Sequence, residues 1–344
     1  MVYFPSFDPP RGAPEFAIDN QRLTIENSSY MFSIDQSMEF VRTLTAEHWI
    51  CLAGLILLAY WLLRTSLGVK ALAGSMPRRN NMPVYLPLIP LLLWFGPVPM
   101  AVLVAHELTG DFSRKGYFTV PADWQIAFLD NCIFIAGGIV TTAVILFLAR
   151  AHFARRLRGF GLDLKTVPVD VFSALVNLLA VWPLIIAAIF ITMFLGRQIW
   201  GQDYQMQRHQ ELELITEYPQ LLLRITVVVA AAIMAPLLEE LLFRGLVQTM
   251  IRSLLQNSIR GRVAGILPAI RGRDALDTGS VWVAIAASSG LFALMHANPG
   301  HWPALFVLGA CMGYAYEKSG SLFRPIFIHA LFNTASLAAA LSQS

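Results

Sequence analysis

Two adjacent glutamates and an arginine are the first residues of this chain whose types and spacing could do chemistry. They read Glu239-Glu240-Leu-Leu-Phe-Arg244 inside a long apolar run. Glu240 and Arg244, four positions apart, can pair on one helix face, which leaves Glu239 pointing elsewhere. An ionisable side chain costs about 2.5–3.5 kcal/mol in a membrane-spanning helix, so these residues predict a functional site. The alternative is one structural cluster of both carboxylates with the arginine.

Two later apolar segments also carry polar residues at helical spacing. Phe292 and His296 are four apart, and the turn signal at residues 298–300 follows them. His329 and Asn333 are again four apart, which puts an imidazole and a carboxamide on one helix face. Either pair alone is equally consistent with a structural role, such as an interhelical hydrogen bond.

Together these residues supply what is needed to activate a water molecule. Glu239 would be the general base, a histidine would position the water or bind a metal, and Asn333 or a histidine would stabilise the oxyanion. Glu239 and His296 both lie roughly 20–24 Å from the same membrane surface, so they can meet. His329 follows Arg324 closely and is expected to be shallower, unless residues 318–325 dip into the membrane.

The elements that position these groups are predicted to be membrane-spanning helices. Of the 344 residues 56% are hydrophobic and only 14% are charged, and the mean hydropathy is +0.58. A soluble domain carries about a quarter charged residues. Helices need about 20 apolar residues to cross a bilayer. We therefore predict an all-α polytopic bundle of eight spans, over residues 48–67, 83–105, 126–149, 169–196, 221–252, 280–296, 302–317 and 322–341.

The charge of the connecting loops predicts their sidedness. Arginine and lysine gather in the first, third, fifth and seventh loops, and acidic residues are more frequent in the second and fourth. By the positive-inside rule the odd-numbered loops are cytoplasmic, so both termini lie outside. We expect an integral protein of a bacterial inner (cytoplasmic) membrane, surrounded by membrane lipid.

Three regions follow from this pattern. Residues 1–47 form a polar extramembrane arm, residues 48–219 hold helices one to four, and residues 220–344 hold the catalytic helices five to eight. The segment 201–219 could form a short interfacial helix, but a solvated loop is the preferred interpretation. The segment 253–279 shows no convincing fold of its own.

Several classes of function are disfavoured. A formal net charge of +3 gives no general electrostatic attraction for nucleic acid, and no nucleic-acid partner is expected. The three cysteines lie in apolar segments without metal-ligand spacing, and we interpret them as inert buried thiols. The oligomeric state is left open.

The three motifs, in this order at the ends of predicted membrane helices, resemble those of the CPBP family, also called the Abi or CAAX-protease family. That pattern is Glu-Glu-x-x-x-Arg, Phe-x-x-x-His and His-x-x-x-Asn, and here it covers roughly residues 220–341. The resemblance implies an intramembrane endopeptidase in which Glu239 and His296 activate water. It further implies that His329 and Asn333 stabilise the oxyanion and that Glu240 and Arg244 support the site or bind the substrate.

The resemblance leaves the cofactor and the substrate open. A divalent metal such as zinc could be held by Glu239, His296 and His329, but a metal-free glutamate mechanism is equally consistent because the chain has no HExxH motif. The substrate would be a membrane-embedded or lipidated peptide or protein.

Two alternative functions are a non-catalytic scaffold or bacteriocin-immunity protein, and a transporter that uses the same groups as an ion relay. The transporter is disfavoured because no inverted repeat is detectable.

Overall fold

The apolar runs of the first half fold into helices that differ in length. The computed structural model describes residues 45–72, 75, 77–115, 121–207, 209–263 and 272–342. Most of the predicted arm, residues 1–44, lies outside the described residues. Gly96 and Pro97 divide the second run into two helices, since proline cannot continue the hydrogen-bond ladder of the helix before it. The helices are α2 (Ala46–Arg64), α3 (Leu88–Phe95), α4 (Pro97–Arg114), α5 (Asp123–His152), α6 (Arg156–Phe160), α7 (Val167–Trp200) and α8 (Gln210–Glu217).

One long interrupted helix dominates the second half. It consists of α9 (Leu221–Val229), the π-helical segment η2 (Ala230–Met234), α10 (Ala235–Glu240), a second π-helical segment η3 (Leu241–Gln248) and α11 (Thr249–Val263). It is followed by α12 (Gly272–Leu294), the short η4 (Pro299–His301), α13 (Trp302–Ser319) and α14 (Phe323–Ser342). The described residues contain no strand, so the all-α prediction is confirmed.

Six of the eight predicted spans are helices long and apolar enough to cross a membrane. Within the described residues they cover 46–64, 88–112, 123–152, 164–200, 221–257 and 323–342. The predicted span 280–296 corresponds to a shorter apolar helix over Thr278–Leu294, and 302–317 corresponds to α13. The protein is therefore a polytopic helix bundle, and the count of eight is not confirmed.

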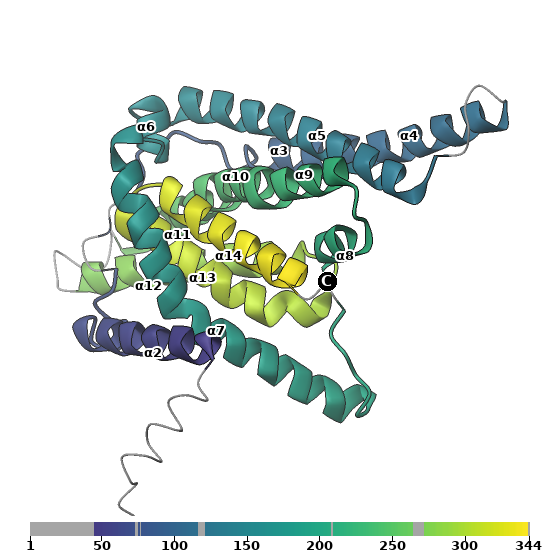
Figure 1. Cartoon of the computed structure of the whole chain (residues 1–344). Helices are drawn as coiled ribbons and strands as arrows, with labels where there is room; N and C mark the ends of the chain where they lie inside the picture. Colours follow the sequence, from purple (N-terminus) through teal and green to yellow (C-terminus); the bar gives the residue numbers. More distant parts are fainter. Residues whose placement is uncertain are drawn as a thin grey trace, which may run out of the picture. The chain divides into compact units, whose positions relative to one another are not determined.

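Helix α7 holds the bundle together because it packs against α2, α13 and α14 (Figure 1). Its buried residues Leu178, Val181 and Ile185 belong to the same apolar core as Leu308 of α13 and Ile328 of α14. The core thus joins the fourth predicted helix directly to the helices that carry the three motifs, which contribute Leu238, Phe292 and Ile328 to it.

The connections predicted to be cytoplasmic gather at one end of the bundle, which we call the basic end (residues 78–81, 152–163, 253 and 319–322). The amide of Ala154 donates to the Arg79 carbonyl at 2.9 Å. The Asn80 side chain reaches the Ser253 hydroxyl at 3.5 Å. The segments 201–209 and 295–301, with α8, gather at another end, the rim end, where Asn298 donates to the Gln207 carbonyl at 3.4 Å. Helix α13 connects the two ends.

The turn between α13 and α14, on which the predicted depth of His329 depended, is buried in the protein. Ser321 and Leu322 are buried, and the Leu322 amide donates to the Gly161 carbonyl at 2.9 Å. Gly320 adopts a φ of 78°, a left-handed conformation that favours glycine and lets α13 end there. The turn is therefore covered by the segment after α6, and α14 starts inside the protein.

Two interpretations of the loops were wrong. The segment 201–219, preferred as a solvated loop, contains α8, and Ile215 of this helix is fully buried in a cluster with Leu223 and Leu337. The apolar face of α8 packs against α9 and α14. A helix of eight residues gives only a weak periodic pattern, so the sequence did not indicate this packing. The segment 253–279 is largely helical, because α11 continues to Val263 and α12 begins at Gly272; residues 264–271 lie outside the described residues.

Candidate active site

The helix that carries both glutamates is π-helical on either side of them. Segment η2 precedes α10 and segment η3 follows it. Pro236 explains the first of these, because it lacks an N–H. In the i to i+5 pattern of a π-helix, Pro236 would have been the donor to the carbonyl of Ala231. π-helical turns occur frequently at functional sites, and here they bracket Glu239 and Glu240.

Asn333 supplies the donor that Pro236 cannot. Its side-chain amide donates to the Ala231 carbonyl at 2.7 Å, which ties α14 to η2. This is the interhelical hydrogen bond that the sequence left as an alternative for Asn333. The other amide hydrogen is not used by that bond, so its predicted role at the oxyanion stays a prediction.

Glu240 lies at the centre of a buried charge network. Its side chain is fully buried, and its Oε1 accepts from the Arg244 guanidinium at 3.0 Å, as the spacing predicted. The same oxygen accepts from Nδ1 of His329 at 3.1 Å. Since a carboxylate can only accept, Nδ1 of His329 is the donor of this bond, and Nε2 is the ring nitrogen left to face another group.

Glu239 points to the other nitrogen of the same imidazole. Its Oε2 lies 4.0 Å from Nε2 of His329, too far for a direct hydrogen bond. That oxygen is buried and has no hydrogen-bond partner, although the side chain as a whole is 24% exposed. The two glutamates therefore contact opposite sides of one histidine, and Glu239 keeps an oxygen available for chemistry, as predicted.

Phe292 is the apolar surface on which the site is assembled. Its fully buried ring lies 4.9 Å from the His296 ring and 5.6 Å from the His329 ring, both edge to face. The Arg244 guanidinium lies over the same ring at 4.6 Å. The contact with His296 was predicted from the spacing, whereas the contacts with His329 and Arg244 were not.

His296 lies beyond the last turn of α12, as the turn signal predicted. Its Nδ1 is 2.8 Å from the Phe292 carbonyl, which must accept, so the neutral ring keeps the Nε2 lone pair. The His296 carbonyl accepts from the Trp302 indole at 2.9 Å. These bonds fix the backbone and the ring of His296 together.

Three further residues at the rim end were missed by sequence reasoning. His209 donates through Nδ1 to Glu211, and its ring lies 6.3 Å from that of His296. It also stacks on the His301 ring at 6.0 Å. A signal existed, because two of the seven histidines stand in adjacent loops on the predicted outer side. Spacing could not join them, since 92 positions separate them along the chain.

The charge of Glu211 governs this cluster. The hydrogen bond to Glu211 raises the pKa of His209 above its ordinary value, against the opposing effect of burial. Burial acts to raise the pKa of Glu211, but the hydrogen bond and charge of His209 lower it overall. Burial and the neighbouring imidazoles lower the pKa of His301. His209 and Glu211 thus form a mutually stabilised ion pair.

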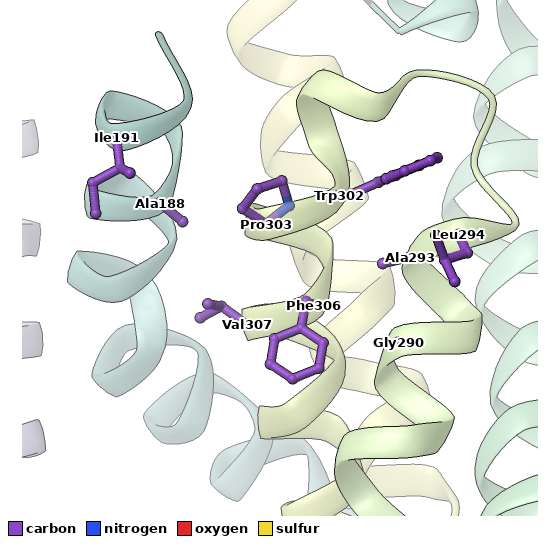
Figure 2. A pocket seen from close by; sticks show the side chains of 9 residues that line it. All are labelled: Ala188, Ile191, Gly290, Ala293, Leu294, Trp302, Pro303, Phe306 and Val307. Carbon is purple, nitrogen blue, oxygen red and sulfur yellow. The ribbon is translucent and has the colours of Figure 1, made fainter. Parts of the chain in front are cut away.

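An apolar pocket of about 440 Å³ opens beside Trp302 at the start of α13 (Figure 2). It lies between α7, α12 and α13 and is lined by Ile191, Ala293, Leu294 and Phe306, among others. Trp302 joins the pocket to the site, because it lines the pocket and also holds the His296 carbonyl. The pocket can receive an apolar group close to Trp302.

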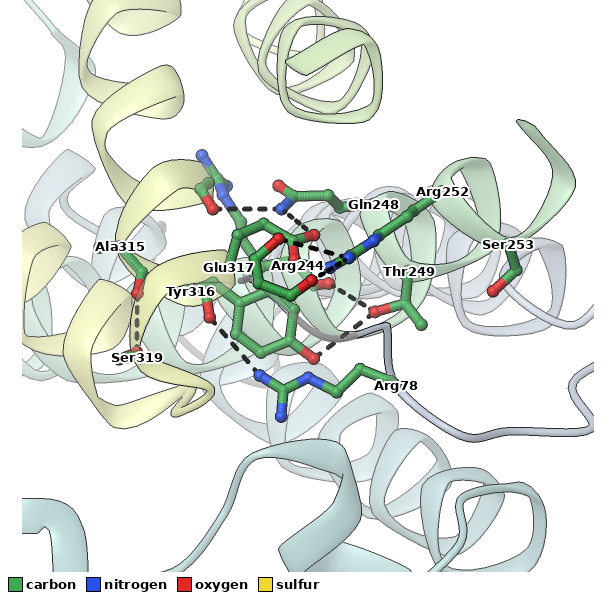
Figure 3. A network of polar contacts seen from close by, with 12 residues as sticks. Arg78, Arg244, Gln248, Thr249, Arg252, Ser253, Ala315, Tyr316, Glu317 and Ser319 are labelled. Atoms are coloured by element: carbon green, nitrogen blue, oxygen red, sulfur yellow. Dashed lines mark hydrogen bonds and ion pairs between the residues drawn. The ribbon is translucent and has the colours of Figure 1, made fainter. Parts of the chain in front are cut away.

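A second polar network ties the motif helix to α13 on the side of the basic end (Figure 3). The Gln248 amide donates to the Gly313 carbonyl and to Glu317, both at 3.1 Å. Glu317 also pairs with Arg252, which donates to the Ser75 carbonyl at 2.9 Å. Glu240, Arg244, Gln248 and Arg252 thus form a buried polar stripe at every fourth position, which fixes the helix against α13.

The predicted metal ligands do not form a metal site as they stand. The described residues contain no group of three or more histidine, cysteine or acidic side chains able to hold a metal ion. Ligands at about 2.0–2.2 Å from one tetrahedral zinc lie closer to each other than the 4.0 Å between Glu239 and His329. The donor positions therefore do not fit, and the involvement of a metal stays a prediction.

The comparisons with known proteins bear on this part of the chain. Residues 221–335 match the model of a family described as type II CAAX prenyl endopeptidase Rce1-like. The match covers about a third of the chain and contains all seven predicted site residues. It confirms the resemblance seen in the three motifs. Comparison with curated proteins and with solved structures finds no match.

Proposed function

From the premise that residues 221–335 resemble a membrane endopeptidase, we propose that this protein hydrolyses a peptide bond in a membrane-embedded or lipidated substrate. The observation that carries the proposal is Glu239: one of its carboxylate oxygens has no hydrogen-bond partner and faces Nε2 of His329, the ring nitrogen that Glu240 does not engage.

In the proposed reaction Glu239 is the general base. It takes a proton from the water as the oxygen attacks the scissile carbonyl, and the resulting carboxylic acid then gives that proton to the leaving amine. His296 offers its free Nε2 to orient the water. His329 is held by Glu240, whose charge is balanced by Arg244, so the imidazole keeps one orientation throughout. No step in this scheme passes through a metal.

The oxyanion is the second requirement of the reaction. We assign its stabilisation to His329, which would donate from Nε2 as an imidazolium because its Nδ1–H is already bonded to Glu240, and to the amide hydrogen of Asn333 that does not bond Ala231. A donor of this kind contributes roughly 10²–10³-fold to the rate in other hydrolases. The pocket beside Trp302 would take an apolar group of the substrate.

The test compares the wild type with Glu239→Gln and His296→Ala in proteoliposomes that contain a fluorogenic single-span peptide. Glu239→Gln keeps the shape of the side chain and removes the base. We expect it to lower turnover by about 10²–10⁴-fold, and His296→Ala to lower it comparably, with insertion and thermal unfolding preserved. Wild-type turnover in either variant would show that the mechanism is wrong. Comparing the membrane proteomes of cells that carry wild type or Glu239→Gln would then identify an accumulating precursor.

A further inference from the structure

The pair formed by His209 and Glu211 stands outside the motifs and outside the mechanism above. We infer that His209, held by Glu211, is a substrate-binding residue of this site, which hydrogen-bonds the peptide backbone of a substrate lying over His296. The inference rests on the proposed function. It concerns a segment before residue 221, where the family match begins.

The position of His209 is determined from two directions. Its Nδ1 is engaged by Glu211 in the first turn of α8, so its Nε2 is the nitrogen left to meet a ligand. The preceding segment is docked on the turn after α12, where Asn298 reaches the Gln207 carbonyl. The His209 ring also contacts the rings of His296 and His301. A side chain held in this way loses little conformational freedom when a ligand binds.

The exposed fraction of the side chains decreases from the rim end toward the general base Glu239. The side chain of His209 is 46% exposed and that of Glu211 is 34% exposed, whereas Glu239 is 24% and His329 is 5% exposed. A substrate that approaches Glu239 from the rim end therefore meets His209 before the catalytic residues. The order of exposure favours a role in binding over a role in the covalent steps.

Hydrolysis of a membrane-embedded peptide requires a hydrogen-bonding partner for the unwound substrate backbone. A peptide bond inside a helix has its N–H and C=O paired, so the segment to be cut must unwind. In an apolar environment each freed backbone group costs several kcal/mol unless it finds a partner. His209 can donate to a carbonyl as an imidazolium, or accept from an amide through Nε2 as a neutral ring. Either form gives the unwound backbone a hydrogen bond next to His296.

The chain contains a matched control pair. His106 and Asp130 also form an exposed histidine–carboxylate pair, at 2.7 Å and with side chains 42% and 34% exposed. They lie on α4 and α5, and neither belongs to the site. Replacement of His106 therefore reports the general effect of losing an exposed ion pair.

The experiment measures binding without cleavage. In the Glu239→Gln background, a fluorescein-labelled single-span peptide with a central Gly-Pro break is titrated in nanodiscs and followed by anisotropy. We expect His209→Ala to weaken binding about three- to tenfold, the effect of one hydrogen bond, and Glu211→Gln to weaken it less. His209→Gln keeps a donor and an acceptor and should retain most of the affinity, whereas His106→Ala should change nothing. Equal affinity of His209→Ala and its parent would overturn the inference.

Turnover separates the inference from the proposed function. With Glu239 intact, His209→Ala should raise KM by a similar factor and leave kcat nearly unchanged. A fall in kcat at unchanged KM would refute the binding role, while cleavage that still depends on Glu239 would leave the proposed function standing. If the wild type neither bound nor cleaved the peptide, both the function and the inference would be wrong.

Discussion

The buried pair of Glu240 and Arg244 gives the strongest quantitative prediction. Both side chains are fully buried, and the two charged groups approach to 3.0 Å. We consider Arg244→Met and Glu240→Gln, singly and together. Each single change leaves the other group without its main charge partner, while the double change removes both charges. The free energy of unfolding should therefore respond non-additively.

The magnitude follows from the geometry. Two unit charges 3.0 Å apart attract by about 5 kcal/mol at an effective dielectric constant of 20, and desolvation offsets much of this. Breaking a buried pair by removing one partner costs about 3–5 kcal/mol. Arg244→Met also removes the contact with the Phe292 ring and the bond to the Gly309 carbonyl. We expect each single variant to lose about 3–5 kcal/mol and the coupling energy to exceed about 2 kcal/mol.

The assay is reversible unfolding in mixed micelles titrated with sodium dodecyl sulfate and followed by circular dichroism. The control is the same cycle on Arg114 and Asp111, whose side chains are 79% and 54% exposed at 3.5 Å. Exposed pairs contribute at most about 1 kcal/mol. A coupling for Glu240 and Arg244 no larger than that of the control would refute the view that a charge-balanced Glu240 holds His329.

Four further outcomes are expected. Asn333→Ala removes one interhelical hydrogen bond and should lower the free energy of unfolding by only about 0.6–1.7 kcal/mol. If Asn333 also donates to the oxyanion, the same variant should lose roughly 10²–10³-fold in kcat, and an unchanged kcat would exclude that role. Gly313→Ala should destabilise the protein because the new Cβ would lie 2.7 Å from Oε1 of Gln248, and an unchanged melting temperature would contradict the close packing of this stripe. Dialysis against a chelator should leave turnover intact, and loss with recovery on adding zinc would require a metal in the mechanism. The protection factors of the α8 amides, which correct for the intrinsic pH dependence of exchange, should be highest at mildly acidic pH. The raised pKa of His209 stabilises α8 below about pH 6.5, and this contribution is lost at higher pH. The lowered pKa of Glu211 stabilises α8 above about pH 4.5, and this contribution is lost at lower pH, so Glu211→Gln should flatten the profile.

The spacing of residues along the chain was sufficient to predict contacts that form within one helix. The pairing of Glu240 with Arg244 and the packing of Phe292 on His296 both follow from a separation of four residues, and both are present. The freedom of Glu239 follows from the same geometry, because its neighbour Glu240 takes the arginine. These contacts were predictable because the backbone of one helix alone decides them.

Contacts between helices were not predictable in this way. Asn333 was placed beside His329 on one face, but its amide is used by Ala231 because Pro236 leaves that carbonyl without a donor. The turn before α14 is covered by Gly161, a contact that the sequence did not indicate. Hydrogen-bond partners that are distant in sequence cannot be read from a pattern along one segment.

The sequence by itself determined that the chain is a membrane helix bundle and predicted which side chains would carry the chemistry, because an ionisable group within an apolar run is too costly to be retained without a use. Only the tertiary structure decided how these groups face one another. In it both glutamates face the imidazole of His329, and the side chains of Arg244, His296 and His329 contact the Phe292 ring. His209, from a segment outside the three motifs, lies next to His296. Packing of distant segments made these choices, because directional hydrogen bonds and ring contacts fix orientation only once the helices have met.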